Sequence, residues 1–162
     1  MIAPPDQWPE KYHGALLFLW QHGWHITLAL LLVLAWSRRS RRTAREVCAT
    51  IGMLYTVVYG FSDSFTFQYF ARAAPFWFFL NPWFCVSAVI VAGGYIYSLY
   101  WFLCGNAWLF GNWDFVGHPN WPPVVIGFRN LAMLFFFINA CVFLVSAIWR
   151  ELVSRLRPIP AL

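Results

Sequence analysis

The chain has 162 residues, of which 61% are hydrophobic, 22% aromatic and only 10% charged. Soluble globular proteins carry about 25% charged residues, and a soluble fold of this length has too little interior to cover so much apolar surface. The formal net charge of +5 comes from Lys and Arg in short blocks beside apolar stretches, as in juxtamembrane anchors. This placement argues against nucleic acid as a partner and predicts an integral membrane protein of a bacterial inner or organellar membrane.

Four apolar stretches are each long enough to cross a bilayer, whose hydrocarbon core requires a helix of about 20 residues. They cover residues 14–36, 47–67, 82–109 and 123–149. We therefore predict an all-α, polytopic integral membrane protein with four transmembrane helices, in which residues 1–162 form a single transmembrane domain. Its expected partners are membrane lipids and other membrane protein subunits.

The first stretch, 14–36, is followed at once by a run of arginines, which predicts a sharp end of the helix at the membrane surface. The second, 47–67, is the least apolar and ends in a polar run that contains Asp63. Two prolines then stand among Phe and Trp residues. Proline interrupts helices and aromatic rings favour the headgroup region. We therefore predict an aromatic interfacial segment between helices 2 and 3.

The third stretch contains Gly93 and Gly94, small residues that let another helix approach closely. A loop rich in Gly, Pro and Trp leads to the fourth stretch. Asn139, near the middle of that stretch, predicts an interhelical hydrogen bond.

Arginines between the first two stretches determine the predicted orientation. They are Arg38, Arg39, Arg41, Arg42 and Arg45. Because Lys and Arg near span ends are retained in the cytoplasm, we predict that the Arg38–Arg45 loop is cytoplasmic and that both termini lie on the opposite side. Four crossings nevertheless place five basic residues on each side. Such a tie also fits a second segment that enters the membrane and returns.

His22, His25 and Asp63 form the candidate cofactor-binding group. The two histidines are three residues apart and so share one face of a helix, and Asp63 is predicted at a similar depth. Ionisable groups in a membrane are costly and mark a site or a structural pair. Imidazole could ligate a tetrapyrrole, a histidine with a carboxylate could transfer protons, or each histidine could bond to a neighbouring helix. A single His-x-x-His without a second pair does not predict a metal site.

Arg129 lies close enough to the start of the fourth stretch for its side chain to reach the interface. Asp114, in the preceding loop, is its natural counter-charge. We predict a structural salt bridge between these two residues. The functional alternative is an arginine that holds the phosphate or carboxylate of a lipid.

The content of Phe, Trp and Tyr exceeds what two interfacial belts require, so some rings are expected to pack on flat apolar partners. We predict a non-catalytic subunit of a larger respiratory or photosynthetic membrane complex, which packs on other subunits and on lipids or pigments. The alternative is a free-standing membrane protein that binds or transforms a lipophilic ligand such as a sterol, quinone or tetrapyrrole. A tetrapyrrole, a carotenoid and a quinone are the candidate cofactors.

Overall fold

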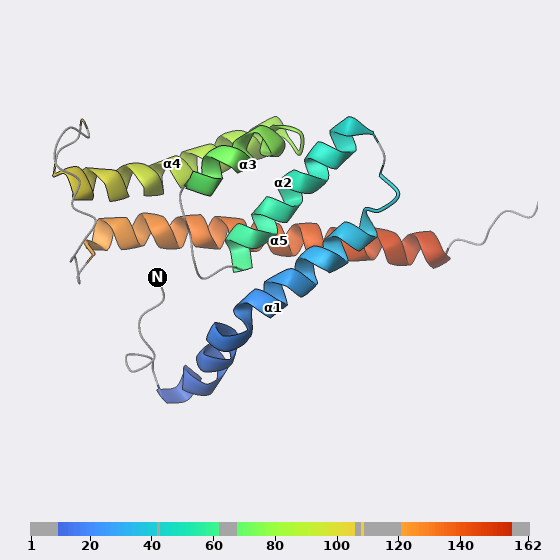
Figure 1. The fold of residues 1–162 in the computed structure, drawn as a ribbon, viewed down its shortest axis with the longest axis horizontal. Coiled ribbons are helices and arrows are strands. Elements are labelled where there is room, and N and C mark those ends of the chain that lie inside the picture. The colour runs from blue at the N-terminus through green and yellow to red at the C-terminus, as the bar shows by residue number, and fades with distance from the viewer. Residues whose placement is uncertain (1–9, 42, 62–67, 106–107, 109–120, 157–162) are drawn as a thin grey trace, which may run out of the picture.

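The computed structural model of the chain describes residues 10–41, 43–61, 68–105, 108 and 121–156. These residues form helices joined by short connections, with no strand among them (Figure 1). The all-helical prediction is therefore confirmed. In chain order the elements are the 3-10 turn η2 (Glu10–Tyr12), α1 (His13–Ser37), α2 (Ala44–Phe61), α3 (Gln68–Phe78), α4 (Pro82–Cys104) and α5 (Pro123–Leu156).

Helices α4 and α5 run antiparallel and side by side along the long axis of the molecule (Figure 1). Leu99, Leu103 and Val125 form a buried cluster where the end of α4 meets the start of α5. A Cβ atom at Gly94 would lie 3.2 Å from the Phe128 ring. The missing side chain at position 94 therefore lets the two helices approach closely, as the glycine pair predicts.

Local chemistry explains the bounds of α4. The Asn81 side chain accepts a hydrogen bond of 2.8 Å from the backbone N–H of Trp83, and Pro82 occupies the first helical position, where its fixed φ favours a helix and no N–H is needed. At the other end, Gly105 adopts a φ of 70° and its N–H bonds to the Trp101 carbonyl. Only glycine takes this left-handed conformation without strain.

Two helices of the described part are long and apolar enough to cross a membrane: α4, and residues Pro123–Val153 of α5. Only 28% and 22% of their most apolar segments are buried, whereas the core helix of a soluble protein is mostly buried. Four transmembrane helices are not supported. The second predicted stretch, 47–67, corresponds to the shorter helix α2, and the predicted interfacial segment contains helix α3.

Helix α2 ends beside the middles of two longer helices. The Thr27 hydroxyl of α1 donates to the Phe61 carbonyl at 3.4 Å, and a Cβ at Gly60 would lie 2.9 Å from the Phe136 carbonyl of α5. Helix α3 then leads back toward the start of α2, because a Cβ at Gly52 would lie 2.7 Å from the Phe76 carbonyl. Helices α2 and α3 thus form a hairpin whose closed end lies halfway along α5.

The connection between α1 and α2 is held by charged and capping interactions. The Thr43 hydroxyl accepts from the Glu46 N–H at 3.3 Å, and the Glu46 carboxylate accepts from the Thr43 N–H at 3.4 Å. This reciprocal pair starts α2. Arg41 lies 3.0 Å from Glu46. The hydrogen bonds from Thr43 are the main cause that lowers the pKa of Glu46 below its ordinary value.

An ion pair joins the α1–α2 connection to the last part of α5. The Arg39 guanidinium donates to the Glu151 carboxylate at 3.3 Å, and both segments lie at the same end of the molecule (Figure 1). Four full crossings would place the Arg38–Arg45 loop and the C-terminal end on opposite sides of the membrane. The structure thus brings this loop and the last part of α5 to one end of the molecule, and the side of the membrane on which the loop lies remains a prediction.

The largest core cluster is aromatic. Trp77 and Phe136 have no exposed surface and stack at a centroid distance of 5.2 Å. Tyr59 and Phe70 pack against the same ring of Phe136 at 5.4 and 5.5 Å. The aromatic rings come from α2, α3 and α5, Ala88 and Ala92 of α4 complete the cluster, and together they hold the hairpin against α5. A good part of the aromatic content therefore serves the protein's own core.

Candidate functional site

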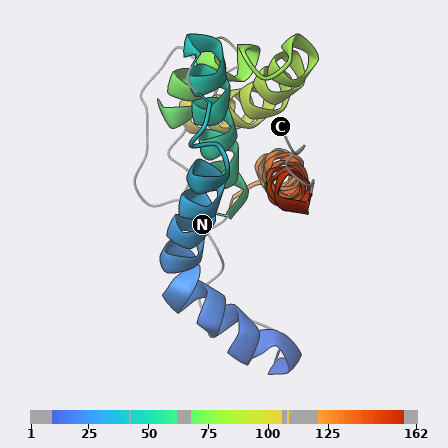
Figure 2. The same cartoon turned by 90° about the vertical axis from the view of Figure 1, so that its right-hand side faces the viewer.

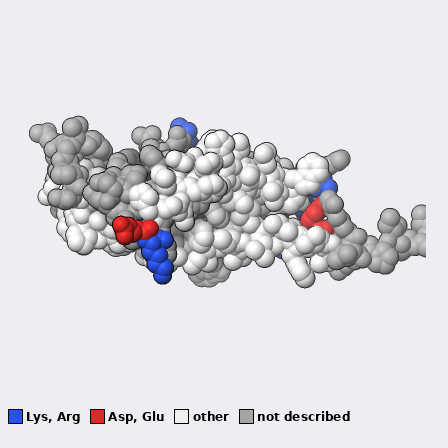
Figure 3. Space-filling view, turned by 90° about the horizontal axis from the view of Figure 1, so that it is seen from below, with Lys and Arg blue, Asp and Glu red and all other residues white. Residues whose placement is uncertain are grey.

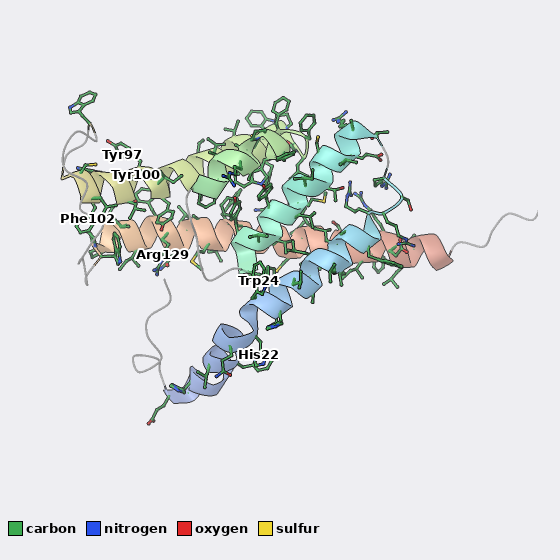
Figure 4. The ribbon with its side chains drawn as sticks, viewed as in Figure 1. His22, Trp24, Tyr97, Tyr100, Phe102 and Arg129 are labelled. Atoms are coloured by element: carbon green, nitrogen blue, oxygen red, sulfur yellow. The ribbon has the colours of Figure 1, made fainter. Side chains whose placement is uncertain are left out.

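His22 lies in the part of α1 that extends away from the other helices (Figures 2 and 4). His25 lies three residues further along the same helix. Both residues are exposed, and their ring centroids are 6.3 Å apart. They therefore share a face, and that face points away from this chain's own bundle.

The His22 ring is held in place by its own helix. It stacks on Phe18 at a centroid distance of 4.5 Å, and its Nδ1 lies 3.1 Å from the Phe18 carbonyl oxygen. A carbonyl can only accept, so Nδ1 carries the proton and Nε2 presents a lone pair outward. A neutral imidazole in this tautomer can accept a hydrogen bond or ligate a metal through Nε2.

Asp63 lies outside the described residues, so the meeting of His22, His25 and Asp63 remains a prediction. Within the described ranges no three His, Cys, Asp or Glu side chains are grouped so that they could hold a metal ion. A cofactor ligated by the two histidines would therefore bind on the outer surface of α1.

Arg129 projects from the first part of α5 (Figure 4). Its Nε and Nη2 donate to the Asn130 side-chain oxygen at 3.3 and 3.1 Å. It borders a gap, too narrow for water, between the rings of Phe70 and Tyr95. Asp114 lies outside the described residues, and the Arg129–Asp114 salt bridge remains a prediction. The Asn139 amide donates to the Phe135 carbonyl of the same helix at 2.8 Å, and its interhelical hydrogen bond remains a prediction.

Seven exposed residues follow one line along α1 at alternating spacings of three and four. They are Ala15, Phe18, His22, His25, Ala29, Leu32 and Trp36. We call this line the α1 seam. Its spacing is that of the contact line of a coiled coil. The helical period predicts its central part, with Phe18 and Ala29 extending the stripe of His22 and His25, and the structure shows that the exposed line continues to Ala15 and Trp36.

A second exposed line follows α4. It contains Trp83, Val86, Ile90, Gly93, Tyr97 and Trp101, and we call it the α4 face. A Cβ atom at Gly93 would meet nothing within 4 Å. Gly94 packs against α5, whereas its neighbour Gly93 lies on the outer surface of α4. Of the glycine pair that predicts a helix contact, only Gly94 makes one within this chain.

Two apolar hollows open on the surface. One, of about 350 Å³, lies between α1 and α2. The other, of about 320 Å³, lies between the end of α4 and the start of α5. The first is lined by Leu31, Leu32, Ala35, Ile51, Leu54, Tyr55 and Val58. Each hollow combines residues from two helices, and for this reason no single stretch of sequence indicated it.

Charge is sparse on the surface. Figure 3 shows one face as a continuous uncharged area with acidic and basic atoms in a few small groups. One such group is formed by Arg39, Glu151, Arg41 and Glu46 at the α1–α2 connection. There, burial and the positive charges of Arg41 and Arg150 lower the pKa of Arg38.

No family model matches the chain, and neither a curated protein nor a solved structure matches it. Its function is therefore argued from its own residues.

Proposed function

We propose that this protein is a multi-pass, non-catalytic subunit of a larger membrane assembly, and that the α4 face receives a transmembrane helix of another subunit. The α4 face carries the argument. A surface that meets only lipid is served by aliphatic residues, whereas Gly93 leaves a gap there that a neighbouring helix fills. Tyr97 and Trp101 on the same line supply the large rings that are enriched in protein interfaces.

The charged interactions support a specific topology. In this proposal α1, α4 and α5 cross the bilayer, and the α2–α3 hairpin enters and returns to the side from which it came. Pro123 and the exposed Trp149 are about 39 Å apart along α5. This distance matches a bilayer of about 40–45 Å with its headgroups.

The same topology removes the tie in the distribution of basic residues. Arg150, Arg155 and Arg157 then share the side of the Arg38–Arg45 loop, Lys11 and Arg129 belong to the other end, and Arg72 lies in the α2–α3 hairpin. Because basic residues are retained in the cytoplasm, the first of these sides is the cytoplasmic one.

Reporter fusions test the topology. Reporters placed after residues 43 and 162 are expected in one compartment, the cytoplasm, and a reporter before residue 1 in the other. Opposite compartments for the first two fusions would restore the four-crossing arrangement and refute the re-entrant hairpin.

The subunit proposal is tested by purification from native membranes in a mild detergent, followed by native mass measurement. The wild-type protein is expected in a particle larger than its own 18.9 kDa and accompanied by other subunits. Gly93→Leu should fill the gap and reduce their recovery about tenfold. Gly127→Leu is the matched control, because a Cβ there also meets nothing within 4 Å and the position lies on α5. A bare monomer from wild-type membranes would contradict the proposal.

The hollow between α1 and α2 supports a second candidate function, the binding of a lipophilic ligand such as a sterol, quinone or tetrapyrrole. Its volume of about 350 Å³ falls in the range of small-molecule sites, about 300–1,000 Å³. Ala35→Trp would fill it from an exposed position. If this function applies, organic extraction and an absorption spectrum should show a ligand with the wild type and none with the variant. Equal extracts from both proteins would exclude the hollow as the binding site.

A further inference from the structure

We infer that two copies of this chain pair along the α1 seam, in the same orientation, with His22 and His25 of each copy hydrogen-bonded across the two-fold axis. This inference rests on the proposed topology, in which α1 crosses the bilayer, and not on the α4 face, which lies on another helix.

The spacing of the α1 seam fits a helix pair. Residues that recur every three and four positions let two helices pack at a small crossing angle, with each seam residue next to its counterpart and to the adjacent seam residues of the other helix. The seam contains two small members, Ala15 and Ala29, which stand on either side of its central histidines. Small residues let helix backbones approach closely in a membrane. Three large members, Phe18, Leu32 and Trp36, are 55%, 63% and 62% exposed.

Lipid alone is a poor cover for the centre of the seam. His22 and His25 lie near the middle of a 25-residue helix. His25 is about 18 Å along the helix axis from its first residue. An imidazole N–H or lone pair exposed to hydrocarbon there loses the hydrogen bonds that water would provide. Leu32 and Trp36 could face lipid at little cost, whereas the two histidines need a polar partner.

The histidines are complementary to each other across a two-fold axis. His22 donates through Nδ1 to the Phe18 carbonyl, so its outward Nε2 can only accept. His25 can present an N–H outward by choice of tautomer. In a symmetric pair, His25 of each copy donates to His22 of the other, and both bonds form at once because the contact is isologous. No charge needs to enter the membrane.

Other covers of this face predict different results. A helix from an unrelated subunit would place that subunit, and no second copy, beside residue 29. A tetrapyrrole ligated by the histidines would give an absorption band that changes with either histidine. A lipid cover would leave both positions without any protein neighbour.

Cysteine cross-linking in native membranes tests the inference with the full chain. Ala29→Cys adds a thiol on the seam, and oxidation is expected to give a product of twice the chain mass. Trp24→Cys is the matched control. Trp24 lies between His22 and His25 in the sequence and is 65% exposed, but it is on another side of the helix from the seam. The untouched wild type gives the background from its own cysteines. Equal yields from both variants, or a product of another mass, would overturn the inference.

A second set of variants, in the Ala29→Cys background, tests the hydrogen bonds. His22→Phe keeps a ring that stacks on Phe18 but removes the acceptor, and it should weaken pairing about tenfold, as expected for two interhelical bonds in a membrane. His22→Gln restores an acceptor and should recover most of the yield. His13→Phe, on the same helix but off the seam, should leave the yield unchanged. Pairing that persists in His22→Phe, or that fails equally in His22→Gln, would refute the role of the histidines.

Discussion

The aromatic core of α2, α3 and α5 and the α1 seam use similar residues for opposite purposes. In the core, Trp77 and Phe136 are fully buried and stacked on each other. On the seam, Phe18 and Trp36 are more than half exposed. An aromatic residue in this chain is therefore no sign of a partner by itself. Its exposure distinguishes rings that pack in this chain's own core from rings that face outward.

Glycines in the core and glycines on the exposed helix faces also differ in what surrounds them. In the core region Gly52 and Gly60 stand against backbone atoms of α3 and α5. On the exposed faces, Gly93 and Gly127 have nothing within 4 Å of an added Cβ. The first two glycines let helices of this chain pack closely on each other. The last two leave room on the surface for another helix to approach.

The largest effect is expected from the centre of the core. Phe136→Ala should lower the free energy of unfolding by about 2–4 kcal/mol, because the rings around position 136 lose their contacts and a cavity remains. The hydrophobic contribution is smaller than in a soluble protein, because the side chain leaves lipid and not water. Unfolding in mixed micelles with increasing SDS measures it. Phe78→Ala is the matched control, since Phe78 is 60% exposed and should change stability little. Equal losses at both positions would remove the distinction between core and surface.

The next effect separates tight from open glycines. Gly52→Ala should cost about 1–3 kcal/mol, because its Cβ would meet the rigid Phe76 backbone and force the α2–α3 hairpin apart. Gly93→Ala should instead stabilise the monomer by about 0.5–1 kcal/mol through helix propensity. Thermal unfolding of the purified protein in one detergent compares the two. A loss of stability in Gly93→Ala would mean that position 93 is already in contact.

A smaller effect concerns the start of α2, which sets the hairpin at the charged end. Thr43→Ala removes the capping hydroxyl and should cost about 0.5–2 kcal/mol. Thr43→Ser keeps the hydroxyl and should cost much less. The same unfolding assay compares the three proteins. Equal losses in both variants would show that the hydroxyl does not carry the cap.

The smallest effect is a pH dependence at the same cap. The pKa of Glu46 is lowered in the folded protein, so its contribution to stability is fully present above the ordinary carboxylate pKa of about 4.3. The contribution is lost as the pH falls through the lower pKa of the folded state. The midpoint of unfolding should therefore fall more steeply below about pH 4.3 in the wild type than in Thr43→Ala, which lacks the hydroxyl bond. Parallel pH profiles would contradict this.

The sequence predicted the helical elements well where start signals and apolar length agree. The windows that begin at 82 and 123 coincide with the starts of α4 and α5, because proline at the first helical position marks both. In the region of 47–81 a polar run and two prolines predicted the end of a span and an interfacial segment. The structure adds that this segment forms α3 and returns along α2 through contacts at Gly52 and Tyr59, which no local pattern specifies.

The sequence by itself determined that the chain is helical and apolar, that basic residues gather between α1 and α2, and that His22 and His25 share one face, since these follow from composition and from the period of the helix. Only the tertiary structure decided that Arg39 meets Glu151, that the α2–α3 hairpin ends beside the middle of α5, and that the histidine face points away from the bundle. These features depend on which sides of helices distant in sequence pack together. In a chain that is apolar on nearly every side, polarity does not encode that choice. Ring stacking, glycine contacts and the Arg39–Glu151 ion pair do.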